Sequence, residues 1–401
     1  MKKPRLLIYI HYLEIGGAER SLLGLLDSLD PDKVDIDLLV NQHTGEFMSL
    51  VPAYVNLLPQ LPEYSAIERP IKDIVREGHI SVALRRLWGK YQHRRHARSA
   101  GYPNADESIL QYVFASVTPA LRDLSYLGEY DLAISFLCPH NIVLRKVKAR
   151  KKVCWIHTDY SKVYINPANE TPVWGGYDKI VSISDDVTKA FCGIFPTLRN
   201  KIIGIENILS PDFIRRQADM EKADAEMPRI PQGVNILSIG RFSVAKRFEA
   251  VPQMCRILLD KGLKFKWYII GYGPDEEIRR NIRRYDVADT LILLGKKSNP
   301  YPYIKACDIY AQPSIFEGKS VTVREAQILG KPPVITAYPT AGSQVRDGVD
   351  GRIVPLDIEG CAQGIYDFAH DMEGRRKICL HLDNNDYGNG TEVEKVYALL
   401  T

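Results

Sequence analysis

Two glutamates separated by seven residues, within the stretch from Phe316 to Ala326, are the side chains of this sequence best suited to chemistry. A carboxylate accepts hydrogen bonds from hydroxyl groups, so Glu317 and Glu325 can hold two parts of a polyhydroxylated ligand. We expect Gly318 to open a helix whose unpaired N–H groups attract an anion. Two surface charges on an amphipathic helix are the alternative, but this stretch is apolar over much of the helix circumference.

A cluster of cations follows the apolar run from Val234 to Ile239, which we predict to be a buried strand. The planar guanidinium of Arg241 can bind two phosphate oxygens, and Lys246 supplies a compact positive charge. Ligands of α/β proteins bind beyond the carboxyl ends of strands, so this loop is suited to a diphosphate. A solvated basic loop is the alternative.

Three further residues follow predicted strands. Gly16 and Gly17 come after the first apolar run, where glycines allow close approach of a ligand to the backbone. The pattern lacks the G-x-G-x-x-G spacing, and a tight turn would also need glycine. His157 follows the run from Val153 to Ile156; a lone histidine is more often structural, and Asp159 is close enough in sequence to orient its ring.

The elements that must position these residues read as two α/β domains. Short apolar runs alternate with stretches of helical periodicity, and runs that are apolar throughout suit parallel strands covered on both faces. The expected strands of the first domain are 6–10, 34–40, 132–137, 153–156, 179–183 and 202–205, and those of the second are 234–239, 265–271, 291–294, 309–312, 334–336 and 352–354.

Domain boundaries follow from composition. The charged, proline-containing segment 210–233 indicates the interdomain linker and domain start. We therefore expect an N-terminal Rossmann-like domain over 1–209 and a C-terminal domain over 210–385. Residues 386–401 carry helical spacing and form the last expected helix. Residues 60–125 read as a helical insertion in the first domain.

Composition excludes several classes of protein. The chain has 401 residues, 45% hydrophobic and 25% charged, as in ordinary globular domains, and the net charge of +4 is too small to indicate nucleic-acid binding. Seven scattered cysteines without a C-x-x-C pair suggest neither a disulfide framework nor a zinc site and fit a reducing cytoplasm. The apolar run Leu6 to Ile10 is too short for a signal peptide or a membrane span.

The motifs together resemble those of retaining glycosyltransferase family 4. The pattern E-G-x₆-E, followed by Ala326 and Gly330-Lys-Pro-Pro, is similar to the signature of that family. Other motifs fall in the order of the family along the whole chain. They are Gly16-Gly-Ala-Glu, Trp155-Ile-His157, Ser182-Ile-Ser-Asp185, Asn207, Gly240-Arg-Phe, Lys246, Ile269-Ile-Gly-Tyr-Gly-Pro274 and Asp350-Gly351.

This resemblance implies a GT-B fold of two Rossmann-like domains facing across a cleft, with a C-terminal helix crossing back to the first domain. It assigns the donor sugar to Glu317 and the nucleotide ribose to Glu325. The remaining implied donor contacts are Gly16, Gly17, Arg241, Lys246, Gly318 and the backbone at Lys319, Ser320 and Val321, and the implied catalytic set is His157, Glu317, Arg241 and Lys246.

Neither a cofactor nor a metal is required by the resemblance, because Arg241 and Lys246 would neutralise the leaving diphosphate. Asp35-Ile-Asp37 matches the metal-binding D-x-D pattern literally. It lies inside a predicted strand, and we interpret the match as accidental. The implied reaction retains anomeric configuration through a front-face displacement. Two alternatives stay open: a UDP-sugar 2-epimerase of the same fold, and a non-catalytic nucleotide-sugar-binding protein.

The implied partners are a nucleotide-sugar donor, with UDP expected before GDP, and a glycan or lipid-linked glycan acceptor. Glu-Gly-Lys-Ser-Val in place of the commoner Glu-Gly-Phe-Gly is similar to bacterial capsule, exopolysaccharide and lipopolysaccharide transferases, and it leaves the donor sugar open. The basic stretch 85–98 is either a solvated helix face or a contact in which Trp88, Tyr91 and nearby arginines rest on anionic headgroups. The expected location is the cytoplasm, with peripheral contact at the inner face of the membrane.

Overall fold

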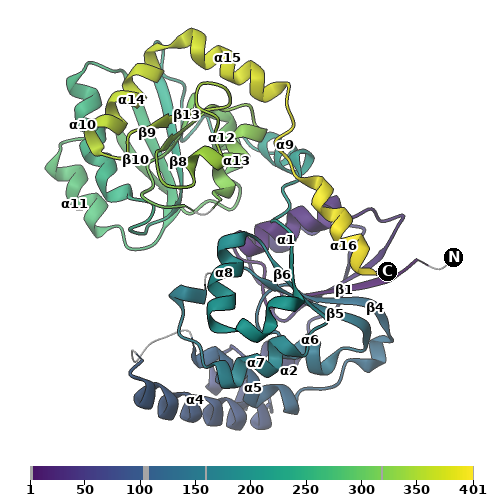
Figure 1. The fold of residues 1–401 in the computed structure, drawn as a ribbon. Coiled ribbons are helices and arrows are strands. Elements are labelled where there is room, and N and C mark those ends of the chain that lie inside the picture. The colour runs from purple at the N-terminus through teal and green to yellow at the C-terminus, as the bar shows by residue number, and fades with distance from the viewer. Residues whose placement is uncertain (1–2, 103–107, 159, 318, 401) are drawn as a thin grey trace. The chain divides into compact units, whose positions relative to one another are not determined.

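The structure is a computed structural model that describes residues 3–102, 108–158, 160–317 and 319–400. The chain divides into two compact units (Figure 1). The N-terminal unit comprises Met1–Ile208 and Gly390–Thr401, and the C-terminal unit comprises Leu209–Asn389. The boundaries expected from composition lay after residues 209 and 385.

The N-terminal unit is built on a seven-stranded parallel sheet in the order β3-β2-β1-β4-β5-β6-β7. The five central strands end in buried, mostly apolar runs, as strands covered on both faces require, whereas the two edge strands are partly exposed. They are β1 (Arg5–Ile10), β2 (Asp35–Val40), β3 (Asn56–Leu57), β4 (Tyr130–Ser135), β5 (Ala149–Ile156), β6 (Lys179–Ser182) and β7 (Ile202–Gly204).

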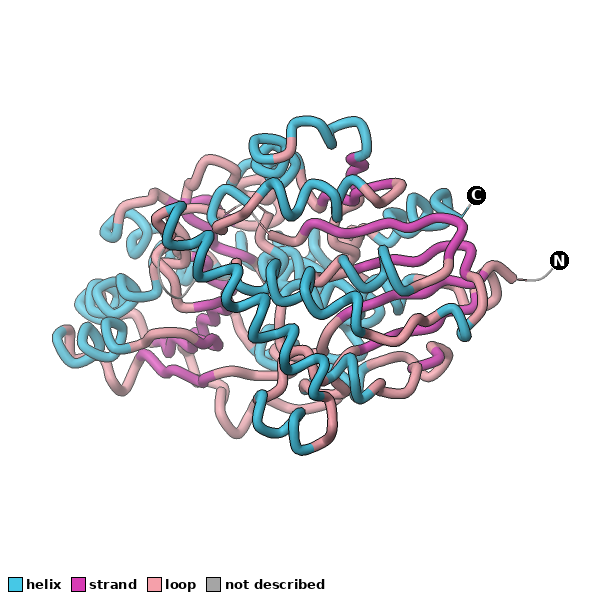
Figure 2. The backbone as a smooth tube through the Cα atoms, turned by 90° about the horizontal axis from the view of Figure 1, so that it is seen from below, coloured by secondary structure: helices cyan, strands magenta, loops and turns pink. Residues whose placement is uncertain are grey.

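Helices cover this sheet; in Figure 2, seen from below, helices lie in front of the parallel strands. The α-helices of the unit are α1 (Gly17–Ser28), α2 (Pro62–Ser65), α3 (Ile71–Arg76), α4 (Ile80–Ala100), α5 (Ile109–Val117), α6 (Asn141–Lys146), α7 (Pro167–Gly175), α8 (Asp185–Ile194) and α16 (Val393–Leu400).

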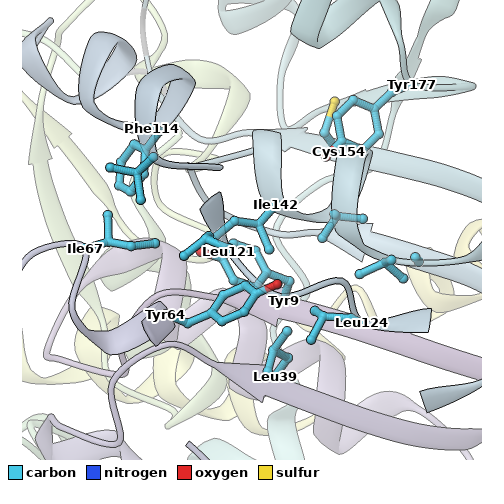
Figure 3. Close-up of a cluster of buried hydrophobic side chains, with 14 of the residues drawn as sticks. Tyr9, Leu39, Tyr64, Ile67, Phe114, Leu121, Leu124, Ile142, Cys154 and Tyr177 are labelled. Carbon is cyan, nitrogen blue, oxygen red and sulfur yellow. The ribbon is translucent and has the colours of Figure 1, made fainter. Parts of the chain in front are cut away.

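The helical insertion expected over 60–125 supplies α2 to α5, between β3 and β4. Its apolar side chains are part of the main core of the unit. Figure 3 shows Tyr64, Ile67 and Phe114 of this segment beside Tyr9 of β1 and Leu39 of β2, and all five are buried. Burying such side chains supplies most of the driving force for folding, so the insertion is an integral layer of this unit.

The C-terminal unit contains a six-stranded parallel sheet in the order β10-β9-β8-β11-β12-β13. Its strands are β8 (Val234–Arg241), β9 (Phe265–Tyr272), β10 (Leu291–Gly295), β11 (Ile309–Gln312), β12 (Pro333–Thr336) and β13 (Arg352–Val354). Its α-helices are α9 (Pro211–Asp219), α10 (Val251–Asp260), α11 (Glu276–Arg284), α12 (Tyr301–Ala306), α13 (Val321–Ile328), α14 (Ile358–His370) and α15 (Met372–Asp383).

The last helix returns to the N-terminal unit, as the resemblance implied. Residues 390–401 belong to that unit, and Val396 of α16 is fully buried. The backbone N–H of Asp30 donates a hydrogen bond of 2.6 Å to the hydroxyl of Tyr397. Two doubly wound parallel sheets with this C-terminal return constitute the expected fold.

Candidate active site

The C-terminal unit brings its chemistry-bearing loops together at the point where its strand order reverses. From β8 the chain proceeds outward through β9 and β10, whereas β11, on the other side of β8, starts the series toward β13. The loops that follow β8 and β11 therefore lie side by side at the carboxyl ends of adjacent strands. Such switch points are where open α/β sheets bind ligands.

An ion pair between Lys246 and Glu317 joins these two loops. Lys246 Nζ lies 2.6 Å from Glu317 Oε1, and the two side chains are only 18% and 12% exposed. The loop after β8 is fixed to the loop after β11, because Ile315 N donates a hydrogen bond of 2.8 Å to Ala245 O. The structure thus joins two residues that are 71 positions apart and that the sequence assigned to one site.

Gly240 explains how the lysine reaches the glutamate. A Cβ atom on Gly240 would lie 3.0 Å from Cε and 3.2 Å from Cδ of Lys246. The apolar stem of the lysine therefore lies against the bare backbone at the end of β8. A side chain at position 240 would push the stem away, so this glycine is a positioning residue for the ammonium group.

Buried polar side chains hold the Glu317 carboxylate. Ser314 Oγ donates to Glu317 Oε1 at 2.6 Å, and Gln312 Nε2 approaches the same oxygen at 3.3 Å. Thr340 Oγ1 donates to the backbone carbonyl of Glu317 at 2.7 Å. Gln312 and Ser314 are completely buried. These three supporting residues were missed by sequence reasoning, although polar residues at the end of an apolar strand are a usable signal.

The start of the following helix differs from the expected one. Helix α13 begins at Val321, with Ser320 as its N-cap in an extended conformation, and not at Gly318. Gln344 explains the delay, because its side chain binds both the N–H (3.1 Å) and the C=O of Ser320. Lys319 is exposed and Val321 is partly buried. Gly318 itself lies outside the described residues.

Glu325 is in a different environment from Glu317. Its side chain is 0% exposed and accepts a hydrogen bond of 2.9 Å from the hydroxyl of Tyr301. The two glutamates thus differ in accessibility, because the Glu317 side chain is 12% exposed and Glu325 is fully enclosed. The binding of a ribose by Glu325 stays a prediction.

Arg241 is the last residue of β8, paired in register with Tyr272 of β9, and its side chain is exposed. The neighbouring loop is tightly built: a Cβ on Gly271 would come within 2.2 Å of the Gly240 carbonyl oxygen. Arg241 thus projects from a fixed backbone at the same end of the sheet as Lys246. Its exposure leaves the guanidinium accessible to an anion.

Gly16 and Gly17 have different structural roles. Gly16 is the N-cap of α1, and a Cβ there would overlap the Glu19 carboxylate, with 2.0 Å to Oε2. A side chain at position 16 would require the Glu19 carboxylate to move. At Gly17, in contrast, an added Cβ would meet nothing within 4 Å. Of the two glycines, Gly17 is the one with open space beside its backbone.

His157 lies directly after β5, and its ring packs on Phe136 with centroids 4.6 Å apart. The ring also lies close to the backbone of Phe136, although neither ring nitrogen makes a hydrogen bond of ordinary geometry within the described part of the chain. Burial lowers the pKa of His157 from its ordinary 6.5 to about 4. Burial, and then the charge on His157, lowers the pKa of His140 to about 3. Both imidazoles are therefore neutral at physiological pH.

These two histidines predict a pH dependence of stability. Their folded-state pKa values lie below the ordinary 6.5, so the unfolded chain binds protons that the folded chain rejects. The contribution of these two histidines to the free energy of unfolding is fully present above pH 6.5 and is lost as the pH falls toward 4. We expect the urea midpoint of the N-terminal unit to decrease over this window. His157→Gln should flatten the decrease, whereas His370→Gln, at an exposed histidine, should not; equal slopes in both variants would contradict the assignment.

The D-x-D match is structural. Asp37 in β2 accepts hydrogen bonds from Arg5 Nη2 at 3.0 Å, from the Tyr130 hydroxyl at 2.6 Å and from Asn56 Nδ2 at 2.6 Å. These donors belong to β1, β4 and β3, so the Asp37 carboxylate is engaged within its own sheet. That the D-x-D match is accidental stays a prediction.

Two doubly wound parallel α/β units, with the last helix returning to the first unit, form the GT-B fold. Residues 220–379 match the family described as "Glycosyl transferases group 1". This segment, which is most of the C-terminal unit, belongs to that family.

Individual proteins agree with this class. The chain is 31% identical over 143 residues, 33% of its length and 34% of the relative's, to the amylovoran biosynthesis glycosyltransferase AmsK of Erwinia amylovora. It is 28% identical over 145 residues, 35% and 39% of the two lengths, to a Campylobacter jejuni enzyme named N-acetylgalactosamine-N,N'-diacetylbacillosaminyl-diphospho-undecaprenol 4-alpha-N-acetylgalactosaminyltransferase. The matched segments thus span a third or slightly more of these curated relatives.

Similarity of fold extends over the whole chain. The crystal structure of Anabaena HepE in complex with UDP-glucose superposes with a TM-score of 0.64 at 15% identity, and the match covers 98% of each chain. At this identity the likeness concerns the fold alone.

Proposed function

We propose that this chain is a retaining glycosyltransferase that moves a sugar from a nucleotide-sugar donor to a hydroxyl group of a glycan. The observation that carries the proposal is the Lys246–Glu317 pair at the switch point of the C-terminal sheet. A cation and a carboxylate at one position suit a ligand with a diphosphate next to a sugar, because the phosphate oxygens need positive charge and the sugar hydroxyls need an acceptor.

On the donor side, Lys246 and Arg241 bind the diphosphate and Glu317 accepts hydrogen bonds from the sugar. Lys246 pairs with Glu317, so an arriving phosphate shares the ammonium with the carboxylate. Ser314 and Gln312 keep the carboxylate in place during this exchange, since they bind the same oxygen. The donor is a UDP-sugar in this proposal, supported by the UDP-glucose named for the HepE structure.

For the chemical step we propose a front-face displacement. The bond between the anomeric carbon and the phosphate oxygen breaks, the acceptor oxygen bonds to the same face of that carbon, and the acceptor proton passes to the departing phosphate oxygen. Lys246, Arg241 and the N–H groups that begin α13 stabilise the negative charge that develops on the diphosphate. With these cations in place the step requires no divalent metal. His157 and Gly17 of the N-terminal unit stay in the proposed set of site residues on the resemblance alone.

The acceptor in this proposal is a surface glycan under construction, carried on a lipid at the inner face of the membrane. The Campylobacter relative is named for transfer to a diphospho-undecaprenol glycan, which supports a lipid-linked acceptor here. No helix in the described ranges has the length and apolarity to span a bilayer. Contact with such an acceptor is therefore peripheral in the proposal.

A donor panel tests the function. We expect UDP and a UDP-sugar to raise the unfolding temperature of the chain, and a ligand at 100 times its dissociation constant adds about 2.7 kcal/mol. With the stabilising UDP-sugar, we expect slow hydrolysis, or transfer to an added glycan, that persists in EDTA. The released or transferred sugar should keep the anomeric configuration of the donor.

Each other outcome identifies a different protein. An epimerised sugar would indicate a UDP-sugar 2-epimerase, and stabilisation without turnover would indicate a binding protein. An inverted product would overturn the front-face step, and loss of activity in EDTA would overturn metal independence. No change in unfolding temperature with any nucleotide or nucleotide sugar would overturn the donor site.

A further inference from the structure

Helix α4 carries its large apolar side chains toward solvent. Figure 1 shows it as the long helix beneath α2 and α5 in the N-terminal unit. Leu84 is 62% exposed and Trp88 is 55% exposed. Soluble proteins rarely expose contiguous apolar patches of this kind without a partner. The exposed apolar residues of the helix are Ile80, Leu84, Leu87, Trp88 and Tyr91.

These residues share one face of the helix. They occupy positions i, i+4, i+7, i+8 and i+11, which lie within a narrow sector at about 100° per residue. The indole of Trp88 stacks on the ring of Tyr91 at a centroid distance of 5.4 Å. Continuing the same spacing, positions i+14, i+15 and i+18 are Arg94, Arg95 and Arg98, all exposed. We call these eight residues the α4 outer face; it is roughly 27 Å long.

The opposite face of α4 does not need apolar side chains of this size. It buries Val82 and Ala83 in the core of the unit, and Gly89 lets the helix approach α5 so closely that a Cβ would lie 2.8 Å from Tyr112 O. Buried Arg86 donates to Ala66 O at 3.0 Å, and buried His93 bonds to Ser108 Oγ at 3.0 Å. The buried face thus combines small apolar residues with hydrogen-bonded polar ones, and the larger apolar side chains face outward.

Charge narrows the choice of partner. The helix Ile80–Ala100 contains six basic residues and no Asp or Glu. A second copy of this chain would place two such positive helices together, which costs energy, so the outer face suits a negatively charged apolar surface. An anionic bilayer offers both properties in the order that the helix displays: hydrocarbon for the apolar half, and phosphates for the arginines.

We propose that the α4 outer face docks the N-terminal unit on an anionic lipid bilayer. Leu84, Leu87 and Trp88 enter the boundary between headgroups and acyl chains, and Arg94, Arg95 and Arg98 bind lipid phosphates. Trp and Tyr prefer this interfacial depth because their rings are apolar with a polar end. The inference deepens the proposed function, because docking brings the chain to a lipid-linked acceptor at the membrane. Only this biological purpose rests on the proposed function.

Tryptophan fluorescence reports on this contact directly. The chain has four tryptophans, and Trp155, Trp174 and Trp267 are buried whereas Trp88 is exposed. We expect the emission of the full chain to shift to the blue when vesicles of phosphatidylcholine with about 30% phosphatidylglycerol are added. Vesicles of pure phosphatidylcholine should cause no shift. Trp88→Phe should abolish the shift while leaving most of the sedimentation with vesicles.

Matched variants distinguish vesicle binding through the α4 outer face from a general effect of positive charge. Arg94→Gln, Arg95→Gln and Arg98→Gln together should weaken vesicle binding by about 100-fold, since each cation near an anionic surface contributes about 1 kcal/mol. Arg280→Gln, Arg283→Gln and Arg284→Gln remove three exposed arginines from α11, which carries no such apolar face. This second triple variant should bind vesicles like the unchanged chain. Leu84→Ser with Leu87→Ser should also weaken binding.

Three results would overturn the proposal: no shift with anionic vesicles, equal loss in the two triple variants, or a concentration-dependent dimer that Leu84→Ser with Leu87→Ser abolishes. Binding to vesicles requires no donor, so this test is independent of catalysis. A chain that transfers sugar to a water-soluble acceptor but ignores vesicles would refute the docking face alone. A chain that binds vesicles but turns over no donor would refute the proposed function alone.

Discussion

Replacing Lys246 by methionine lowers the rate of sugar transfer by about 100- to 1,000-fold, the loss typical of removing one group that stabilises charge in a transition state. Methionine keeps the apolar stem that lies against Gly240 and removes only the ammonium group. The departing diphosphate then lacks its enclosed cation. Turnover with a saturating UDP-sugar, and the dissociation constant of UDP from thermal shifts, measure the two parts of the effect.

Two controls accompany this variant. Lys246→Arg keeps the positive charge but replaces the compact ammonium group with a planar guanidinium group, so we expect partial activity. Lys264→Met makes the same chemical change at an exposed lysine of the same unit and should leave the rate unchanged. Full activity of Lys246→Met would show that the ion pair with Glu317 is structural and that the diphosphate is held by other groups.

Replacing Glu317 by glutamine also lowers transfer by about 100- to 1,000-fold, because this carboxylate is expected to bind the sugar as charge develops on it. The change is isosteric, and Ser314 can still donate to the remaining carbonyl oxygen. Lys246, however, loses its negative partner at 2.6 Å. We therefore expect UDP alone to bind as tightly as before or more tightly, while the UDP-sugar loses its advantage over UDP.

This opposite response of nucleotide and sugar distinguishes Glu317 from a residue that merely supports the fold. A damaged fold would weaken both ligands and lower the unfolding temperature. Glu276→Gln, at an exposed glutamate of α11, is the matched control and should change neither ligand. Equal weakening of UDP and UDP-sugar by Glu317→Gln would remove Glu317 from the sugar site.

The parallel sheets could be predicted because their strands are short apolar runs, and each of the twelve expected strands has a counterpart among β1 to β13. The exception is β3, whose two residues, Asn56 and Leu57, form too short a segment to show any periodicity. That Lys246 and Glu317 belong to one site could also be predicted, since both residues follow strands that sequence order places near a switch point.

Other details depended on contacts between residues far apart in sequence. The start of α13 is set by Gln344, which binds Ser320 from 24 positions away. The enclosure of Glu325 requires Tyr301, also 24 positions away. The exposure of Trp88 and Tyr91 fits both interpretations of the basic stretch 85–98, a solvated helix face and a membrane contact. The close packing of Gly89 on α5, which fixes the opposite face, depends on contacts that the sequence pattern does not show.

The return of residues 390–401 to the first unit bears on how the chain folds during synthesis. These residues complete the N-terminal unit through buried Val396 and through the hydrogen bond that Glu392 Oε2 accepts from Glu206 N at 2.9 Å. The C-terminal unit, in contrast, is continuous in sequence. A nascent chain therefore contains every residue of its second unit before it contains every residue of its first, and the ribosome releases the last helix only after both sheets have been made.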